Sequence, residues 1–268
     1  MKKKRLIPVL LLKNGYLVQS KNFKFYQNLG NPVQAVKRLS QWASDELIYL
    51  DISKSDNYDI ERDDLKYKNS SNFLSIIKKV SEVTFMPITV GGKIQNLFDA
   101  EKRLEIGADK ISINTAALEN PNFIESLAKE FGSQCIVISI DVKLIDDKYR
   151  IFSHGGSKET DYDLEDWIGI LEQNGAGEVL INSIDRDGSG IGYDLNLLNI
   201  VSKKTKIPVI ACGGVGKWEH FHEALSETEV DAVSAANIFH YVDQSVYLSK
   251  KYLYEKKLNI RKPDLIEI

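Results

Sequence analysis

The sequence predicts a single α/β barrel of eight parallel strands, a (β/α)8 TIM barrel that takes in residues 1–268. Three observations predict it: eight short apolar runs occur, most are followed by an amphipathic stretch, and the runs are apolar throughout rather than alternating. Strands that are apolar on both faces are typical of a parallel sheet covered on both sides. Closing the sheet is the simplest way to accommodate eight such units.

The expected strands are short and separated by regular intervals. In chain order they span residues 5–12, 47–51, 87–90, 110–113, 135–141, 178–182, 208–212 and 231–235. Amphipathic segments between them predict helices, for example at 31–43, 96–107 and 163–175.

Two segments interrupt this alternation. Residues 53–71 are polar and charged and predict a long loop after the second strand, whereas residues 144–160 predict a small hairpin inserted after the fifth. In a barrel both lie at the carboxyl ends of strands, the face that carries active sites. Long loops are usually functional or disordered, so a lid or contact role and passive decoration both stay open.

Composition limits the function classes. The chain is 43% hydrophobic and 27% charged, with a formal net charge of −3, and this balance gives nucleic-acid binding no electrostatic support. No apolar run approaches the length of a membrane span, so we expect a cytoplasmic protein. The two cysteines, Cys135 and Cys212, lie in apolar runs and are expected to be reduced core residues.

The sequence also contains an internal repeat, in which residues 87–116 align with residues 208–237. The barrel is therefore expected to consist of two similar halves, strands 1–4 and 5–8. Extending the alignment to the first strand of each half places Leu11 on Asp141. One half ends its first strand in a carboxylate and the other has a leucine there. The other matched residues are Lys13 with Lys143, Glu46 with Glu178, Gly91-Gly92 with Gly213-Gly214, Asp109 with Asp231, Asn114 with Ala236 and Thr115 with Asn237.

The glycine pairs predict phosphate binding. Glycine lets the backbone adopt positive φ and approach a ligand closely, and main-chain N–H groups at such turns can bind phosphate. Barrels commonly bind phosphate after strands seven and eight, and the repeat adds a weaker twin site, so the ligand would carry a phosphate at each end. The alternative is that each pair is only a tight turn. The predicted residues are Gly213, Gly214, Ala236 and Asn237, and for the twin Gly91, Gly92, Lys93, Asn114 and Thr115.

A glycine-rich loop follows the sixth strand, within residues 181–194. Asp187 and Gly188 are candidates there for holding ribose hydroxyls or phosphate, after Asp185 and Arg186. These residues could instead cap the next helix and pair with one another. The glycine density favours a ligand loop.

Several segments between Arg5 and about Phe239 are highly specific together: TVGGKI, GADKISINTAALENP, FGSQ, SIDRDG, GYD, GGVGK with the EHF and EA that follow it, and AANIFH. With these segments the sequence resembles the cyclase subunit of imidazole glycerol phosphate synthase, the HisF family. The neighbouring isomerase of histidine synthesis is also similar, but DELIYLDI and SINTAA fit the cyclase better.

The resemblance implies a reaction. A separate glutaminase subunit releases ammonia, which crosses the barrel and reacts at its mouth with a phosphoribulosyl aminoimidazole carboxamide ribotide. Two aspartates act as general acid and base, one at Asp141 and the other at the position of Leu11. No metal and no organic cofactor is implied. Four residues near the amino ends of strands, whose charges sum to zero, match the family's ammonia gate, although they could simply plug the barrel floor: Arg5, Glu46, Lys110 and Glu178.

Three departures from the family pattern matter chemically. Leu11 can neither accept nor donate a proton, Gln19 replaces a lysine of the mobile first loop, and Lys93 replaces the third glycine of GGG. Paralogues of this kind are associated with adding an acetamidino group to bacterial surface sugars, such as those of lipopolysaccharide, together with a glutaminase and a separate amidotransferase. Three hypotheses follow: an ammonia-conducting subunit with a different acceptor, a working cyclase in which another group replaces the acid, and a non-catalytic scaffold.

Overall fold

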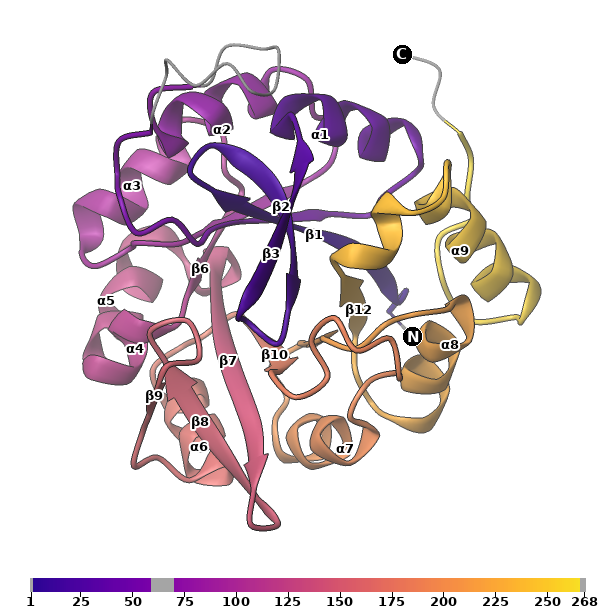
Figure 1. The fold of residues 1–268 in the computed structure, drawn as a ribbon. Coiled ribbons are helices and arrows are strands. Elements are labelled where there is room, and N and C mark those ends of the chain that lie inside the picture. The colour runs from indigo at the N-terminus through magenta and orange to yellow at the C-terminus, as the bar shows by residue number, and fades with distance from the viewer. Residues whose placement is uncertain (1, 59–69, 266–268) are drawn as a thin grey trace.

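Eight parallel strands close into a barrel in this computed structural model, which describes residues 2–58 and 70–265 (Figure 1). β12 pairs back onto β1, with Arg5 opposite Ala232, so the described sheet closes on itself. The predicted fold class is confirmed, and every predicted strand is present with small shifts at its ends. The strands, in barrel order, are β1 (Arg5–Lys13), β4 (Leu47–Asp51), β5 (Ile88–Gly91), β6 (Lys110–Ile113), β7 (Ile136–Ile145), β10 (Glu178–Ser183), β11 (Val209–Cys212) and β12 (Ala232–Ala235).

Helices surround the strands, and side-chain caps fix where several of them begin. The Asn31 side chain accepts hydrogen bonds from the amides of Val33 and Gln34 at the start of α1, and Asp163 caps α6 in the same way. The predicted helices at 31–43, 96–107 and 163–175 correspond to α1, α3 and α6. The helices are α1 (Pro32–Gln41), α2 (Phe73–Ser81), α3 (Leu97–Glu105), α4 (Thr115–Glu119), α5 (Asn122–Phe131), α6 (Leu164–Gln173), α7 (Leu195–Lys204), α8 (Trp218–Glu227) and α9 (Ser245–Glu255), with 3-10 turns η1 (Ser133–Cys135) and η2 (Asn237–His240).

The first strand of each half continues into an antiparallel hairpin. The hairpin predicted at 144–160 is present as β7, β8 (Lys148–Ser153) and β9 (Lys158–Glu159). The family resemblance implies a mobile loop at Gln19, but this segment is a hairpin, because β2 (Tyr16–Lys21) and β3 (Phe25–Gly30) pair there. The sequence signal was Asn14-Gly15, which turns with φ of 53° and 83°. Asn-Gly is the preferred two-residue hairpin turn because both residues tolerate positive φ.

Alternation along the strands sorts side chains between two cores. Residues on one face of each strand point into the barrel and those on the other face pack under the helices. On β1, Ile7 and Val9 belong to the inner cluster, whereas Leu6, Leu10 and Leu12 belong to the outer one. The other buried members of the inner cluster are Ile48, Val137, Leu180, Ile210 and Ala232.

An equivalent hydrogen bond occurs in each half, at positions that the repeat aligns. The Asp109 carboxylate accepts a hydrogen bond from the Ile88 amide at 2.8 Å. The aligned Asp231 carboxylate accepts one from the Val209 amide at 3.0 Å. Each aspartate therefore ties the start of its own strand to the preceding strand, as expected of similar half-barrels.

Two further predictions concern the polar loop after β4 and the two cysteines. A long loop was predicted at 53–71, and its residues 59–69 lie outside the described residues. An isolated β-bridge joins Asn57, which precedes that segment, to Asn72, which follows it. Cys135 lies in η1 rather than in a strand, because Gly132 starts a turn there and β7 begins one residue later. Both cysteines are free, but both are half-buried rather than core residues.

Among the helices that the structure describes, none is long and apolar enough to span a membrane.

Candidate functional site at the barrel mouth

Asp141 lies at the carboxyl end of the barrel, on the inward face of β7 and opposite Asn182 of β10. Its Oδ1 accepts a hydrogen bond from Asn182 Nδ2 at 3.4 Å, and its Oδ2 accepts one from Asn114 Nδ2 at 3.3 Å. Burial raises the pKa of Asp141 to about 7; the Asn182 hydrogen bond opposes this shift and the charge of Asp187 adds to it. A carboxyl with such a pKa can give or take a proton near neutrality.

Leu11 faces the barrel interior from β1. It packs, partly buried, on the inner cluster, as do Leu50, Cys212 and Ala236. In the sheet it lies between Val18 of β2 and Leu50 of β4. The mouth is therefore apolar on the side of β1 and β4 and polar on the side of β6, β7 and β10.

The glycine pair of the C-terminal half lies beside Asn182, because Cys212 is the register partner of Asn182 and precedes Gly213. Gly213 and Gly214 have φ of 94° and 102°, and a Cβ on Gly214 would overlap the carbonyl oxygen of Gly192. Only glycine fits this turn. Nearby, Asn237 Nδ2 donates to the Ser20 carbonyl at 2.7 Å, while its buried Oδ1 has no partner among the described residues.

The glycine pair of the N-terminal half forms the same kind of turn. Gly92 has φ of 101°, and a Cβ there would overlap the Asp51 carbonyl. Asn114 bonds to Asp141, and Thr115 Oγ1 accepts a hydrogen bond from the His154 amide at 3.0 Å. Both glycine pairs thus lie at the same end of the barrel as Asp141, and close backbone packing explains why glycine stands in both.

The loop after β10 is held against the β2–β3 hairpin. Ser20 Oγ donates to Asp187 Oδ2 at 2.7 Å, the Phe23 amide donates to the same oxygen at 3.3 Å, and the Asn22 amide donates to the Asp187 carbonyl. A Cβ on Gly188 would overlap the hairpin at Ser20 and Lys21. Burial raises the pKa of Asp187, and the hydrogen bonds from the hairpin oppose that shift. The hairpin therefore crosses the mouth (Figure 1).

Four charged residues form a closed ring at the opposite end of the barrel. Arg5 Nη1 contacts Glu46 Oε1 at 2.5 Å and Glu178 Oε1 at 2.8 Å. Lys110 Nζ contacts Glu46 Oε2 at 3.0 Å and Glu178 Oε2 at 2.8 Å. Burial disfavours the charge of Arg5, but the two carboxylates outweigh it and raise its pKa. The residues predicted at the floor do come together, and each cation is shared between two carboxylates.

Comparison with known proteins identifies the family. A model of the family described as histidine biosynthesis protein matches residues 5–245. The chain is similar to a protein named imidazole glycerol phosphate synthase subunit HisF from Hydrogenobaculum sp. (strain Y04AAS1), with 41% identity over 259 residues, which cover 96% of this chain and 98% of that protein. The chain belongs to the HisF family. This confirms the resemblance drawn from the motifs, and the barrel fits it.

Some residues at this HisF-family mouth were missed by sequence reasoning. Asn182 follows Leu180 by two positions, so strand alternation alone places it inward and beside Asp141. Ser20 could be placed only after recognising the Asn14-Gly15 turn. Arg103, which donates to the Gly92 carbonyl at 2.7 Å, gave no signal in the sequence, because a helical arginine is usually exposed.

Proposed function

We propose that this HisF-family chain is the synthase subunit of a glutamine amidotransferase complex and conducts ammonia through its barrel to a phosphorylated acceptor at the mouth. A separate HisH-like glutaminase supplies the ammonia at the barrel floor. For the acceptor we favour a nucleotide-activated bacterial surface sugar that receives an acetamidino group with the help of a separate amidotransferase. The acceptor's phosphate binds at Gly213, Gly214, Ala236 and Asn237, with Asp187 and Gly188 alongside.

Leu11 is the observation that carries the choice of acceptor. It faces the interior at the mouth, where the family resemblance places the second acid. One acid–base group typically contributes about 10²–10⁴-fold to a rate, and a leucine contributes none of this. A barrel that keeps Asp141, the phosphate cradle and the floor but lacks the partner acid is suited to delivering ammonia rather than to closing an imidazole ring.

The layers of the barrel support an ammonia route. The charged ring at the floor is followed along the same strands by an apolar column that includes Ile7, Val9 and Ile48, and then by the polar side of the mouth. A neutral small molecule can cross an apolar column that excludes ions. Buried ion pairs are often no more stabilising than apolar residues of the same size, so a mere plug has no need of four charges.

The alternative is a genuine cyclase subunit of histidine biosynthesis. It is favoured by the 41% identity with a HisF subunit over nearly the whole of both chains. Another group must then replace the acid missing at Leu11. Asp187 is the candidate, because it is a half-buried carboxyl whose charge acts on Asp141.

Complementation of a histidine auxotroph that lacks the cyclase subunit separates the two functions. We expect no growth from this chain, whether expressed alone or with a cognate glutaminase, and growth from an ordinary HisF in the same vector. Growth at the rate of that control would establish the cyclase alternative. The purified chain alone should not hydrolyse glutamine, and any such activity that is lost in Cys135→Ala or Cys212→Ala would contradict the need for a partner.

A further inference from the structure

Two glycine-rich loops interlock at the C-terminal glycine pair, one after β10 and one after β11. The Gly192 amide donates to the Gly214 carbonyl at 2.8 Å. A Cβ on Gly214 would overlap the Gly192 carbonyl oxygen, and a Cβ on Gly216 would overlap the carbonyl oxygen of Gly190. Because no side chain fits between the loops, the shape of each depends on the position of the other.

His220 of α8 contacts both loops. Its Nδ1 accepts a hydrogen bond from the Gly216 amide at 3.2 Å. A Cβ on Gly192 would lie 3.3–3.5 Å from three atoms of the imidazole ring, so Gly192 packs directly on that ring. His220 is only 5% exposed. A buried side chain that contacts both loops can fix one loop against the other.

The hydrogen bond with Gly216 requires a neutral ring. An Nδ1 that accepts a hydrogen bond carries no proton, so the ring proton lies on Nε2. Burial lowers the pKa of His220; the charge of Glu223 opposes this shift, that of Lys217 adds to it and that of Glu219 opposes it. The ring is therefore neutral at pH 7.5, and Nδ1 can accept.

Two neighbouring amides remain for a ligand. Neither the Gly214 amide nor the Val215 amide donates a hydrogen bond to another of the described residues. Gly213 and Gly214 have φ of 94° and 102°, and main-chain N–H groups in such turns form concavities that bind anions. Since His220 takes the Gly216 amide, the donors that precede it in the loop are the ones available to phosphate.

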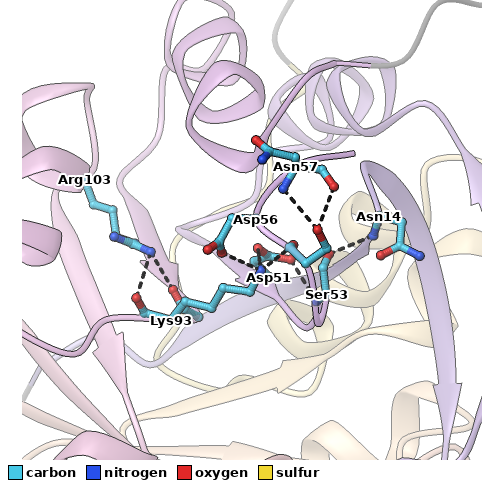
Figure 2. A network of polar contacts seen from close by, with 9 residues as sticks. Asn14, Asp51, Ser53, Asp56, Asn57, Lys93 and Arg103 are labelled. Carbon is cyan, nitrogen blue, oxygen red and sulfur yellow. Dashed lines mark hydrogen bonds and ion pairs between the residues drawn. The ribbon is translucent and has the colours of Figure 1, made fainter. Parts of the chain in front are cut away.

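The N-terminal glycine pair is supported in a different way. Counted from the glycine pairs, His220 aligns with Phe98, which is 59% exposed. Arg103 of α3 instead donates to the carbonyls of Gly92 and Lys93, at 2.7 and 3.3 Å (Figure 2). The helix after each pair therefore supports the turn, through carbonyls in one half and through an amide in the other.

We propose that His220 is a positioning residue that holds the two glycine loops in the arrangement that binds phosphate. This inference rests on the proposed function, in which the C-terminal glycine pair binds the phosphate of the acceptor. Without an acceptor at the position of Nδ1, the Gly216 amide is released and the loop from Gly214 onward can shift. Phosphate affinity should then fall, although no group that contacts the phosphate has been changed.

Equilibrium dialysis with labelled inorganic phosphate at pH 7.5 tests the proposal in two matched variants. His220→Asn places a carboxamide oxygen where Nδ1 was, whereas His220→Gln carries the same group one bond further from the backbone. We expect His220→Asn to bind phosphate within about twofold of the wild type. His220→Gln should bind it about three- to tenfold more weakly, the loss expected for one hydrogen bond. The control is His222→Gln, whose ring contacts Ser226 of the same helix, and it should bind phosphate as the wild type does.

Melting temperatures show whether a variant has lost its fold rather than its loop arrangement. Equal affinities in His220→Gln and the wild type, or equal losses in the two His220 variants, would overturn the proposal. Spectra of the ¹⁵N-labelled wild type give a test that needs no substitution: added phosphate should shift the amide signals of Gly214 and Val215, and shifts centred elsewhere would overturn it. A wild type that binds no phosphate would instead refute the phosphate-binding function, and this inference with it.

Discussion

At the scale of single residues, the chemistry of the mouth depends on Asp141 and on what faces it. Asp141 is buried and held by two asparagine amides, and Leu11 contributes an apolar surface on the β1 side. The two positions occupy matching places in the two halves. Exchanging the leucine for an acid is therefore the most direct test of what the mouth has lost.

Leu11→Asp should restore part of a cyclase rate with free ammonia and the family's ribotide substrate. One acid–base group is worth about 10²–10⁴-fold, and since Gln19 and Lys93 also differ, we expect a gain of about tenfold. The matched control is Leu11→Asn, which has the same size but cannot transfer a proton. Equal rates in the two variants would contradict the acid–base explanation. Wild-type turnover equal to that of an ordinary HisF would show that no acid is missing.

The raised pKa of Asp141 predicts how stability depends on pH. The pKa is about 7 in the folded protein against an ordinary value of 3.8, so the folded state holds this proton more tightly than the unfolded state does. Stability from this group is therefore present below pH 4 and is lost as pH rises to 7, by at most about 1.4 kcal/mol per pH unit. Asp141→Asn should gain stability relative to the wild type between pH 5 and pH 8.

Denaturant unfolding at those two pH values measures the effect. Asp147→Asn, on an exposed turn, serves as the control and should show the same difference from the wild type at both. A pH-independent difference for Asp141→Asn would mean that the carboxyl is ionised throughout.

At the scale of elements, the β2–β3 hairpin is the part that crosses the mouth. Beyond the pairing of β2 with β1, several of its polar contacts with the barrel converge on two residues: Ser20, Asn22 and Phe23 donate to Asp187, and the Ser20 carbonyl accepts from Asn237. Gln19 Oε1 also accepts a hydrogen bond from the Tyr241 hydroxyl at 3.0 Å. Asp187 and Asn237 are also among the residues proposed to hold the acceptor. The hairpin and a ligand therefore share partners, and the strength of the hairpin contact affects access to the site.

Ser20→Ala should loosen the hairpin without unfolding the barrel. A hydrogen bond to a charged group contributes about 1.5–3 kcal/mol, so local opening should increase about tenfold or more. Trypsin cleavage after Lys21 or Lys24 reports that opening, while the melting temperature should change little. Ser126→Ala is the control, because the Ser126 hydroxyl donates to the Asn122 carbonyl within its own helix α5. Unchanged cleavage would show that the Ser20 contact does not hold the hairpin.

At the scale of the whole molecule, the barrel is arranged in layers from floor to mouth. Alternation along the strands gives a charged ring, an apolar column and a polar mouth on one inward-facing surface. The ring is balanced, since Arg5 and Lys110 face Glu46 and Glu178. Its stability should therefore depend on the charge balance of the four residues together.

Lys110→Met leaves two carboxylates with a single arginine and should destabilise the protein by about 3 kcal/mol, because it leaves an uncompensated buried charge. Adding Glu46→Gln restores a net charge of zero and should recover most of this loss. Chemical denaturation of the single and double variants measures both effects. Additive losses in the double variant would show that the ring residues act independently.

The sequence by itself determined the barrel, its two halves and the family. Parallel-sheet strands are buried on both faces, so their apolar runs are visible without any tertiary information. The glycine pairs Gly91-Gly92 and Gly213-Gly214 made the repeat detectable. The four floor residues could also be predicted, because they lie near the amino ends of strands and match the gate residues of the family that the sequence resembles.

Only the tertiary structure decided which site residues are available. No local pattern shows that the β2–β3 hairpin binds Asp187, that the His154 amide takes up Thr115, or that Lys93 turns toward Asp51 and Asp56. These contacts join residues between 37 and 167 positions apart in the chain, and they form only once the barrel has closed. The physical reason is that neighbours in space decide which donors and acceptors of a side chain are already bonded. Strand and helix periodicity, by contrast, is set by neighbours in the chain.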